Sequence, residues 1–262
     1  MGGAVSPTPV TFPTVTPPPP LPPTATFPPP TPIPPPTWTP VTSYAGPAMR
    51  SGVSIVAARR SPPTIDGYLT DWSETIYPAS YPVYGADAIS NADDLSSKVM
   101  VAWDDHYLYI GARVDDDAYI QNATGKYLYR GDSVEVLLDT NVAGDFYYDV
   151  LSPDDYQLGV SPGNPTRGVN TEAYLWYPSS LAGPVTSVQI GVLSLPGGYH
   201  LELAIPWSLF NVTPFVGQHF GFAFSVSDND TGSQNVQQSM VSSVPTRVLT
   251  RPTTWGDLTL GP

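Results

Sequence analysis

Apolar side chains recur at every second position in several short segments of the chain after residue 53. Residues 106–117 (HYLYIGARVDDD), 198–207 (GYHLELAIPW) and 219–230 (HFGFAFSVSDND) follow this alternation. A period of two is typical of a strand that buries one face and leaves the other more polar. These segments therefore predict half-buried antiparallel strands. The side chains expected to face a core are Leu108, Ile110, Ala112, Val114, Tyr199, Leu201, Leu203, Ile205, Phe220, Phe222, Phe224 and Val226.

Turn-forming residues separate these segments. Residues 104–106 (DDH) follow the apolar run 99–103, and Pro-Gly-Gly occupies 196–198, so both places predict hairpin turns. Residues 255–260 (WGDLTL) supply a last short strand, and residues 206–210 (PWSLF) indicate one helical turn begun by a proline. No segment of ten or more residues holds a helical period. The sequence therefore predicts an all-β fold, a two-sheet antiparallel β-sandwich of immunoglobulin or jelly-roll type.

The first 49 residues differ in composition from the rest. Eighteen of the 33 prolines lie within residues 1–50, with threonines between them, and the first charged residue is Arg50. Such a tract cannot bury a core and favours extended polyproline II geometry. We expect an extended Pro/Thr-rich stalk or linker at residues 1–49 and a globular head at residues 50–262. The tract is interpreted as a stiff spacer carrying O-glycan acceptors, as a linker from a longer parent protein, or as a segment that self-associates into the spine of a fibre.

Charge and cysteine content exclude several classes of function. The formal net charge is −13, which argues against nucleic acid or an anionic membrane as partner. The absence of cysteine excludes disulfides, thiolate metal sites and cysteine nucleophiles. No run of about 18 apolar residues predicts a transmembrane segment. The opening MGGAVSPTPV lacks the features of a signal peptide, so we expect a mature or truncated form of a protein located outside the cell or at its surface.

A carboxylate stands in the middle of one predicted strand, residues 129–140 (YRGDSVEVLLDT). Val134, Val136 and Leu138 share the expected core face, and Glu135 lies on the opposite face. Two interpretations remain open. Glu135 accepts hydrogen bonds from a ligand, or it pairs on the open face of the sheet with Arg113 or Arg130.

The order of the segments resembles the family 9 carbohydrate-binding modules. The resemblance runs from about Ile65 to Leu260 and rests on ordered succession more than on one motif. The segments that carry it are TIDGYLTDW, VAWDDHYLYIGARVDDD, YRGDSVEVLLDT, GYHLELAIPWSLF, GFAFSVSDND and RPTTWGDLTL. It implies a β-sandwich that binds a polysaccharide or oligosaccharide and is not an enzyme.

The resemblance also implies a binding site. Tyr129 stands where the family has one wall of an aromatic sandwich around a terminal sugar, and Glu135 stands where a glutamate accepts sugar hydroxyls. Leu249 occupies the position of the second aromatic wall. The family's arginine, expected in the strand after residue 140, has no counterpart in DFYYDVL, which offers Tyr148 or Asp149. Arg130 and Trp176 are the residues expected to compensate.

Acidic loops raise the question of calcium. Asp139, Asn141 and Asp145 form one candidate metal site, and the acidic runs at 115–117 and 228–230 offer others. The resemblance favours structural calcium at one or more of them, whereas ordinary turn chemistry is the alternative for each. Asp132 is interpreted as structural, binding backbone N–H groups at the start of its strand. The three histidines, His106, His200 and His219, are scattered, and no catalytic motif is present.

Two hypotheses about function follow from these features. The first is a non-catalytic extracellular carbohydrate-binding module displayed on a stiff Pro/Thr stalk. The alternative is a structural cell-surface or filament subunit in which the proline-rich segment mediates self-assembly.

Overall fold

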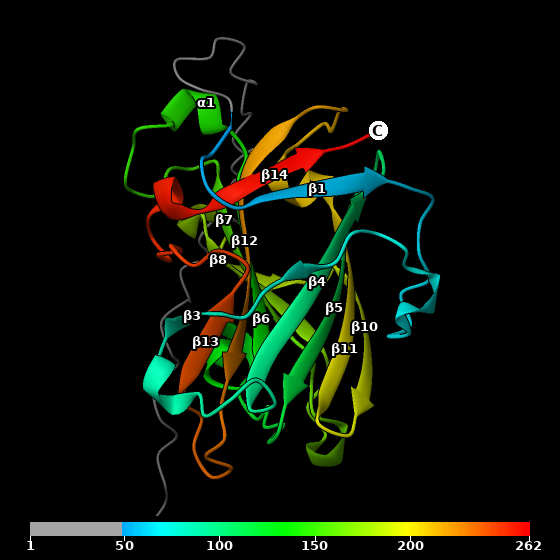
Figure 1. Cartoon of the computed structure of the whole chain (residues 1–262), viewed down its shortest axis with the longest axis vertical. Helices are drawn as coiled ribbons and strands as arrows, with labels where there is room; N and C mark the ends of the chain where they lie inside the picture. Colours follow the sequence, from blue (N-terminus) through cyan, green and yellow to red (C-terminus); the bar gives the residue numbers. More distant parts are fainter. Residues whose placement is uncertain (1–48) are drawn as a thin grey trace, which may run out of the picture. The chain divides into compact units, whose positions relative to one another are not determined.

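The computed structural model describes residues 49–262, and within this range most of the regular secondary structure is β-strand (Figure 1). The predictions for the Pro/Thr tract, including its three interpretations and the filament alternative, lie outside the described residues. The strands are β1 (Ser54–Arg59), β2 (Tyr77–Pro78), β3 (Tyr81–Tyr84), β4 (Leu95–Trp103), β5 (Tyr107–Asp116), β6 (Ser133–Asp139), β7 (Asp155–Ser161), β8 (Glu172–Tyr177), β9 (Gly183–Val185), β10 (Gln189–Leu195), β11 (Gly198–Pro206), β12 (His219–Asp228), β13 (Ser239–Ser242) and β14 (Gly256–Leu260).

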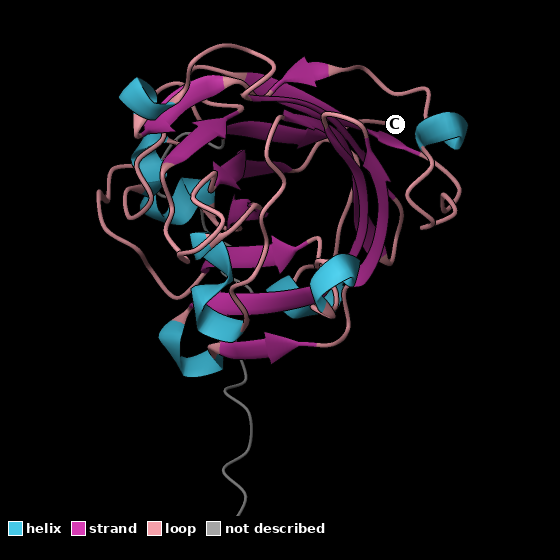
Figure 2. Ribbon diagram, turned by 90° about the horizontal axis from the view of Figure 1, so that it is seen from below, coloured by secondary structure: helices cyan, strands magenta, loops and turns pink. Residues whose placement is uncertain are grey.

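The strands form two sheets joined through β1. One sheet has the order β10-β11-β5-β4, and the other has the order β14-β12-β6-β7-β8-β9. Strand β13 adds to β12 and carries β3 on its other side, and β2 pairs with β4. Seen end-on, the strands curl around a common interior (Figure 2). The predicted two-sheet sandwich is therefore confirmed.

Strand β1 departs from the predicted antiparallel pairing. Residues 54–57 pair in parallel with β14, and residues 58–59 pair in parallel with β4. The strand bridges the edges of the two sheets, where β4 and β14 run in the same direction, so it is parallel to both. All the other strand pairs within the described residues are antiparallel.

The predicted inward faces of the strands form the core. All twelve side chains named from the alternation are buried and belong to one continuous apolar cluster between the sheets. Trp103, Trp207 and Phe210 add large rings to it. The prediction succeeded because burial of one face dominates the energetics of a sheet, and the period of two directly reports which face is buried.

The turns and helices also agree with the sequence. Asp104 Oδ1 accepts hydrogen bonds from the backbone N–H groups of His106 and Tyr107, each at 2.7 Å, and closes the β4–β5 hairpin. The β10–β11 hairpin turns at Gly197 and Gly198, whose φ angles of 74° and 135° disfavour other residues. Residues 207–210 form the predicted helical turn, a 3₁₀ helix. One four-residue α-helix, α1 (Val142–Asp145), is present within the described residues.

A loop covers the outer face of the second sheet, the face turned away from the core. Val244 and Trp255, at the two ends of this loop, pack against Leu137 of β6 and Ala223 of β12. Because this packing fixes the loop on the sheet, residues 247–249 stand as a wall beside the neighbouring strands. No helix of the described residues has the length and hydropathy needed to cross a membrane.

Candidate functional site

A cavity of about 730 Å³ lies on the outer face of the second sheet. Strands β6, β7 and β8 contribute to it, as do β3, β13, the 3₁₀ helix η3 (Gly125–Arg130) and the covering loop. The lining residues are Val83, Tyr84, Lys126, Tyr127, Tyr129, Glu135, Gln157, Trp176, Gln237, Met240, Arg247, Val248 and Leu249. Sequence reasoning had singled out four of these positions: Tyr129, Glu135, Trp176 and Leu249.

Tyr129 and Trp176 form an aromatic wall. Their ring centroids are 5.9 Å apart and the rings meet edge to face at 77°. The indole Nε1 of Trp176 donates to the backbone oxygen of Lys126 at 3.0 Å, which ties β8 to η3. Gly159 of β7 leaves room for the indole, because a Cβ there would stand 2.1 Å from the ring of Trp176. Both aromatic residues remain partly exposed to solvent.

Glu135 faces this cavity and is paired at the same time. Glu135 is 6% exposed and forms an ion pair with Arg247, which is 8% exposed. The predicted partners of Glu135 were wrong: Arg113 pairs with Asp115 at 2.8 Å, and Arg130 Nε donates to the hydroxyl of Tyr129 at 3.3 Å. Since carboxylate and guanidinium hold each other, the site presents a fixed acceptor beside fixed donors.

The arginine of this site comes from the covering loop. The segment DFYYDVL was expected to be the strand after β6, but the next strand is β7, which presents Gln157 to the cavity. Tyr148 is 64% exposed outside the cavity, and Asp149 pairs with Arg251. This expectation failed because α1 and a loop intervene between β6 and β7.

Leu249 stands at the wall where the resemblance places a second aromatic ring. Gln157 Nε2 donates to its backbone oxygen at 2.9 Å. The preceding residue, Val248, is fixed on both sides: its N–H donates to Thr254 Oγ1 at 2.9 Å, and its oxygen accepts from Trp255 Nε1 at 3.0 Å. Leu249 therefore lines the cavity with an aliphatic side chain.

Several lining residues were missed from the sequence. Tyr84, 54% exposed, reaches the cavity from β3, which pairs with β13. Lys126 and Tyr127 precede the predicted Tyr129 on η3. The only sequence signal for these two is the alternation of cationic and aromatic residues in KYLYR, which allows cation–π contacts. Arg130 does not line the cavity, but its guanidinium lies over the rings of Tyr127 and Tyr129, at 4.9 Å and 5.7 Å.

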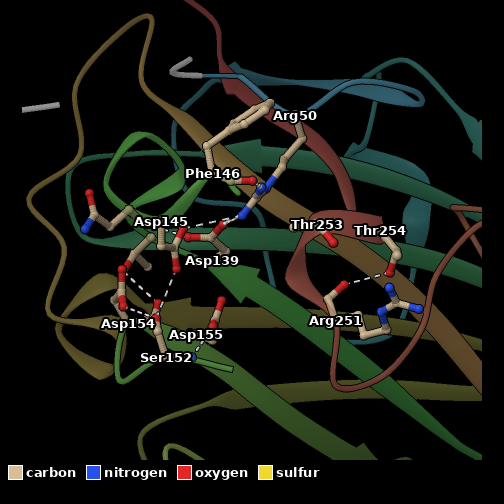
Figure 3. A network of polar contacts seen from close by, with 12 residues as sticks. Arg50, Asp139, Asp145, Phe146, Ser152, Asp154, Asp155, Arg251, Thr253 and Thr254 are labelled. Carbon is tan, nitrogen blue, oxygen red and sulfur yellow. Dashed lines mark hydrogen bonds and ion pairs between the residues drawn. The ribbon is translucent and has the colours of Figure 1, made fainter. Parts of the chain in front are cut away.

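Two of the three residues of the predicted metal site come together. The carboxylates of Asp139 and Asp145 lie close to that of Asp155, while Asn141 donates its backbone N–H to Asp139 at 2.9 Å. Arg50 enters this cluster and pairs with Asp139 at 2.6 Å and with Asp145 at 3.4 Å (Figure 3). A guanidinium therefore already supplies one positive charge to this group.

Two carboxyl groups of this cluster, those of Asp145 and Asp155, have raised pKa values. Burial, with the charge of Asp139 next in importance, raises the pKa of Asp145 to about 7, and the same two causes raise the pKa of Asp155 to about 8. Ser152 donates its hydroxyl to Asp145 at 3.1 Å and its N–H to Asp155 at 2.6 Å (Figure 3). One oxygen of Asp155 is buried without a hydrogen-bond partner among the described residues.

A second acidic cluster joins the two other predicted loops. Asp116 lies close to Asp228 and Asp230, and Asp230 also lies close to Asp94 and Asp117. No lysine or arginine forms an ion pair with these residues in the described part of the chain. Burial raises the pKa of Asp228 to about 7, and one buried oxygen of Asp228 has no hydrogen-bond partner there. An oxygen-only donor set with uncompensated charge fits a hard divalent cation.

Asp132 has a structural position. It is fully buried and accepts hydrogen bonds from the backbone N–H groups of Ile120 and of Asn229, the latter at 2.9 Å. Its carboxylate thus joins two loops at the end of the sandwich beside the second acidic cluster. The histidines lie elsewhere: none of the three lines the cavity within the described residues.

Comparisons with known proteins identify the family of the chain. The family model described as "Carbohydrate family 9 binding domain-like" matches residues 65–261. The chain is 28% identical over 212 residues to endo-1,4-beta-xylanase A of Thermotoga maritima, covering 80% of this chain and 18% of that protein. It is 31% identical over 192 residues to endo-1,4-beta-xylanase A of Thermoanaerobacterium saccharolyticum, covering 72% and 14%. The chain therefore spans less than a fifth of the length of these curated relatives.

Solved structures show the same fold. A family 9 carbohydrate-binding module from Caldicellulosiruptor kristjanssonii, in complex with cellotriose, aligns with a TM-score of 0.62 and 23% identity, covering 80% of this chain and 94% of that one. The same module in complex with glucose aligns with a TM-score of 0.60. The family is a non-catalytic binding domain, found in the matched enzymes beside other parts of their chains. By the match over residues 65–261, this chain belongs to the carbohydrate family 9 binding domain-like family.

Proposed function

We propose that the head binds the end of a β-1,4-linked oligosaccharide in the cavity between Tyr129, Trp176 and Leu249. The observation that carries the proposal is the ion pair of Glu135 and Arg247 within reach of an aromatic wall. Solved members of the family bind cellotriose and glucose, and the curated relatives are xylanases, which supports this class of ligand.

The chemistry of the cavity suits a pyranose. Aromatic rings bury the axial C–H faces of a sugar by dispersion and removal of apolar surface from water. The oxygen of Glu135 accepts from one hydroxyl and the guanidinium of Arg247 donates to its neighbour, so a vicinal pair of hydroxyls meets complementary groups. A cavity of about 730 Å³ falls within the range typical of small-ligand sites, which accommodates a short oligosaccharide. Leu249 contributes an apolar contact without the stacking of a ring.

Isothermal titration calorimetry with cellotriose and xylotriose tests the proposal. We expect Trp176→Ala and Tyr129→Ala each to weaken binding about tenfold, because an aromatic contact of 1–2 kcal/mol is lost. Tyr68→Ala is the matched control, since Tyr68 is 51% exposed and lies outside the cavity. Undiminished binding by a Tyr129→Ala/Glu135→Ala double variant would show that the ligand binds elsewhere.

We also propose that calcium binds at the second acidic cluster and stabilises the head. Asp116, Asp228 and Asp230 would supply the carboxylate oxygens, and the raised pKa of Asp228 supports a need for positive charge there. Thermal unfolding with and without calcium tests this. Asp230→Asn should remove most of the calcium-dependent rise in Tm, whereas Asp93→Asn, an exposed neighbour, should keep it.

The proposed place of action is outside the cell, where polymeric glycans are found. The similarity to xylanases supports this placement, and the absence of cysteine is compatible with it. Protease treatment of intact cells that express the full-length protein tests it: digestion of the head places the head outside.

A further inference from the structure

Positive charge is scarce in this protein, and part of it gathers at the rim of the cavity. The chain has 10 lysines and arginines against 23 aspartates and glutamates, and all ten lie within the described residues. Six of them form ion pairs with carboxylates: Arg50, Arg59, Arg60, Arg113, Arg247 and Arg251. The four without such a partner in the described part of the chain are Lys98, Lys126, Arg130 and Arg167. Two of these four, Lys126 and Arg130, stand on the single helix η3.

The two cations of η3 converge on one ring. The Lys126 Nζ lies 5.0 Å from the ring centroid of Tyr127, and the Arg130 guanidinium lies 4.9 Å from the same centroid. Like charges near one ring repel each other, and an anion bound beside them offsets that repulsion. Glu172, on strand β8, accepts the backbone N–H of Gly125 at 2.8 Å and forms an ion pair with neither cation in the described part of the chain.

The floor of the cavity adds no net negative charge. Its one carboxylate, Glu135, is neutralised by Arg247, whose Nε is buried without an acceptor among the described residues. Lys126 therefore gives the lining a net charge of +1, and Arg130 beside it adds a second positive charge. At an ionic strength of 0.1 M charges beyond about 10 Å are largely screened, so a bound ligand responds mainly to the charges at the cavity rim and less to the net −13 of the whole chain.

We propose that the preferred sugar unit carries a carboxylate, so that the ligand is a uronic acid or an oligosaccharide ending in one. This inference rests on the proposed sugar-binding function and names its substrate class. The pyranose ring packs on Tyr129 and Trp176, its hydroxyls meet Glu135 and Arg247, and its carboxylate lies at the η3 edge between Lys126 and Arg130. A carboxylate matches the planar fork of Arg130, which bonds two oxygens at once.

A matched pair of ligands isolates the carboxylate. Methyl β-D-glucopyranoside and methyl β-D-glucuronide differ only in whether C6 is an alcohol or a carboxylate, and their affinities are compared by NMR titration at pH 7. We expect the glucuronide to bind about three- to tenfold more tightly. Lys126→Gln and Arg130→Gln should each lower this ratio of affinities about two- to fivefold.

Arg167→Gln is the control variant. Arg167, like Arg130, is the last residue of a 3₁₀ helix, is exposed and has no carboxylate partner in the described structure, but it lies outside the cavity. It should leave the ratio unchanged. Glucose 6-sulfate forms a third arm, because a sulfate ester carries the same charge with tetrahedral oxygens.

The outcomes separate the two proposals. Equal binding of glucoside and glucuronide would overturn the preference for a carboxylate and leave the proposed function standing. Tighter binding of the 6-sulfate than of the glucuronide would also overturn it. A ratio that Lys126→Gln/Arg130→Gln leaves unchanged would show that another part of the surface selects the acid. If none of these sugars binds and cellotriose does not bind either, both proposals are overturned.

Discussion

Replacement of Arg50 by methionine removes the positive charge from the first acidic cluster, which consists of Asp139, Asp145 and Asp155. Arg50 is 3% exposed, and its guanidinium bonds Asp139 at 2.6 Å and the backbone oxygen of Phe146 at 2.7 Å. The guanidinium also lies 5.2 Å from the centroid of the Phe146 ring. Methionine keeps much of the volume, so the variant mainly tests the charge. Asp139 is fully buried and would keep only the N–H of Asn141 as partner.

The expected loss follows from the fate of Asp139. An unpaired buried charge costs about 3–5 kcal/mol. The carboxyl escapes part of this cost by taking up a proton. From its ordinary pKa of 3.8 to pH 7, protonation costs about 4.4 kcal/mol at 1.36 kcal/mol per unit. We therefore expect Arg50→Met to lower the free energy of unfolding by about 3–4 kcal/mol at pH 7 and by no more than about 2 kcal/mol at pH 5.

Urea unfolding followed by tryptophan fluorescence measures this loss. Arg59→Met is the matched control: it breaks an arginine–aspartate pair of the same 2.6 Å length, but with side chains 44% and 61% exposed, so the loss should stay below about 1 kcal/mol. Arg50→Met/Asp139→Asn should recover part of the stability, since no charge is left buried. A loss for Arg50→Met equal to that of the control, or equal at pH 5 and pH 7, would refute the reasoning.

Three further changes have defined outcomes. Glu135→Gln removes the counterion of the buried Arg247 and should lower the free energy of unfolding, measured by urea titration, by about 2 kcal/mol. The affinity for cellotriose, measured by calorimetry, should fall about tenfold. Unchanged affinity would contradict the role of Glu135 in ligand binding. Gly159→Ala adds a Cβ 2.1 Å from the ring of Trp176 and should therefore displace the indole. We expect the ligand-induced change in tryptophan fluorescence to disappear and the binding affinity to fall severalfold. Retained affinity would show that the ring adapts. Calcium-free protein should lose stability as the pH rises from 5 to 8. Asp145 and Asp155, with pKa values raised to about 7 and about 8, bind more protons in the folded state than in the unfolded state, so low pH favours the folded state. A Tm that rises over this pH range without calcium would contradict this sign.

Local pattern predicted the core of this molecule well. The inward side chains of β5, β11 and β12 followed from alternation alone, because each strand decides its buried face within a few residues. The family resemblance located Tyr129 and Leu249, which reach the cavity from segments 120 residues apart. Ordered succession of motifs carries such long-range information, which periodicity does not.

The partner of Glu135 was beyond sequence reasoning. Arg247 lies 112 residues away in a loop without strand periodicity, and its placement depends on Val244 and Trp255 packing on the sheet. Arg50 entered the first acidic cluster for the same kind of reason, since its contacts with Asp139 span 89 residues. Tyr84 reached the cavity through a short strand paired to β13. Arg247 and Arg50 are positioned by loop packing and Tyr84 by a long-range strand pairing, and neither leaves a periodic trace in the chain.

The parallel pairing of β1 with β14 gives the head a defined response to pulling. Ser54 lies opposite Asp257 and Ala57 opposite Leu260, so tension applied before β1 and after β14 draws the two strands past each other along their length. All the inter-strand bonds of that pair must then yield together instead of opening one at a time from an end. A head pulled at both ends of its chain thus has β1 and β14 arranged to share the strain.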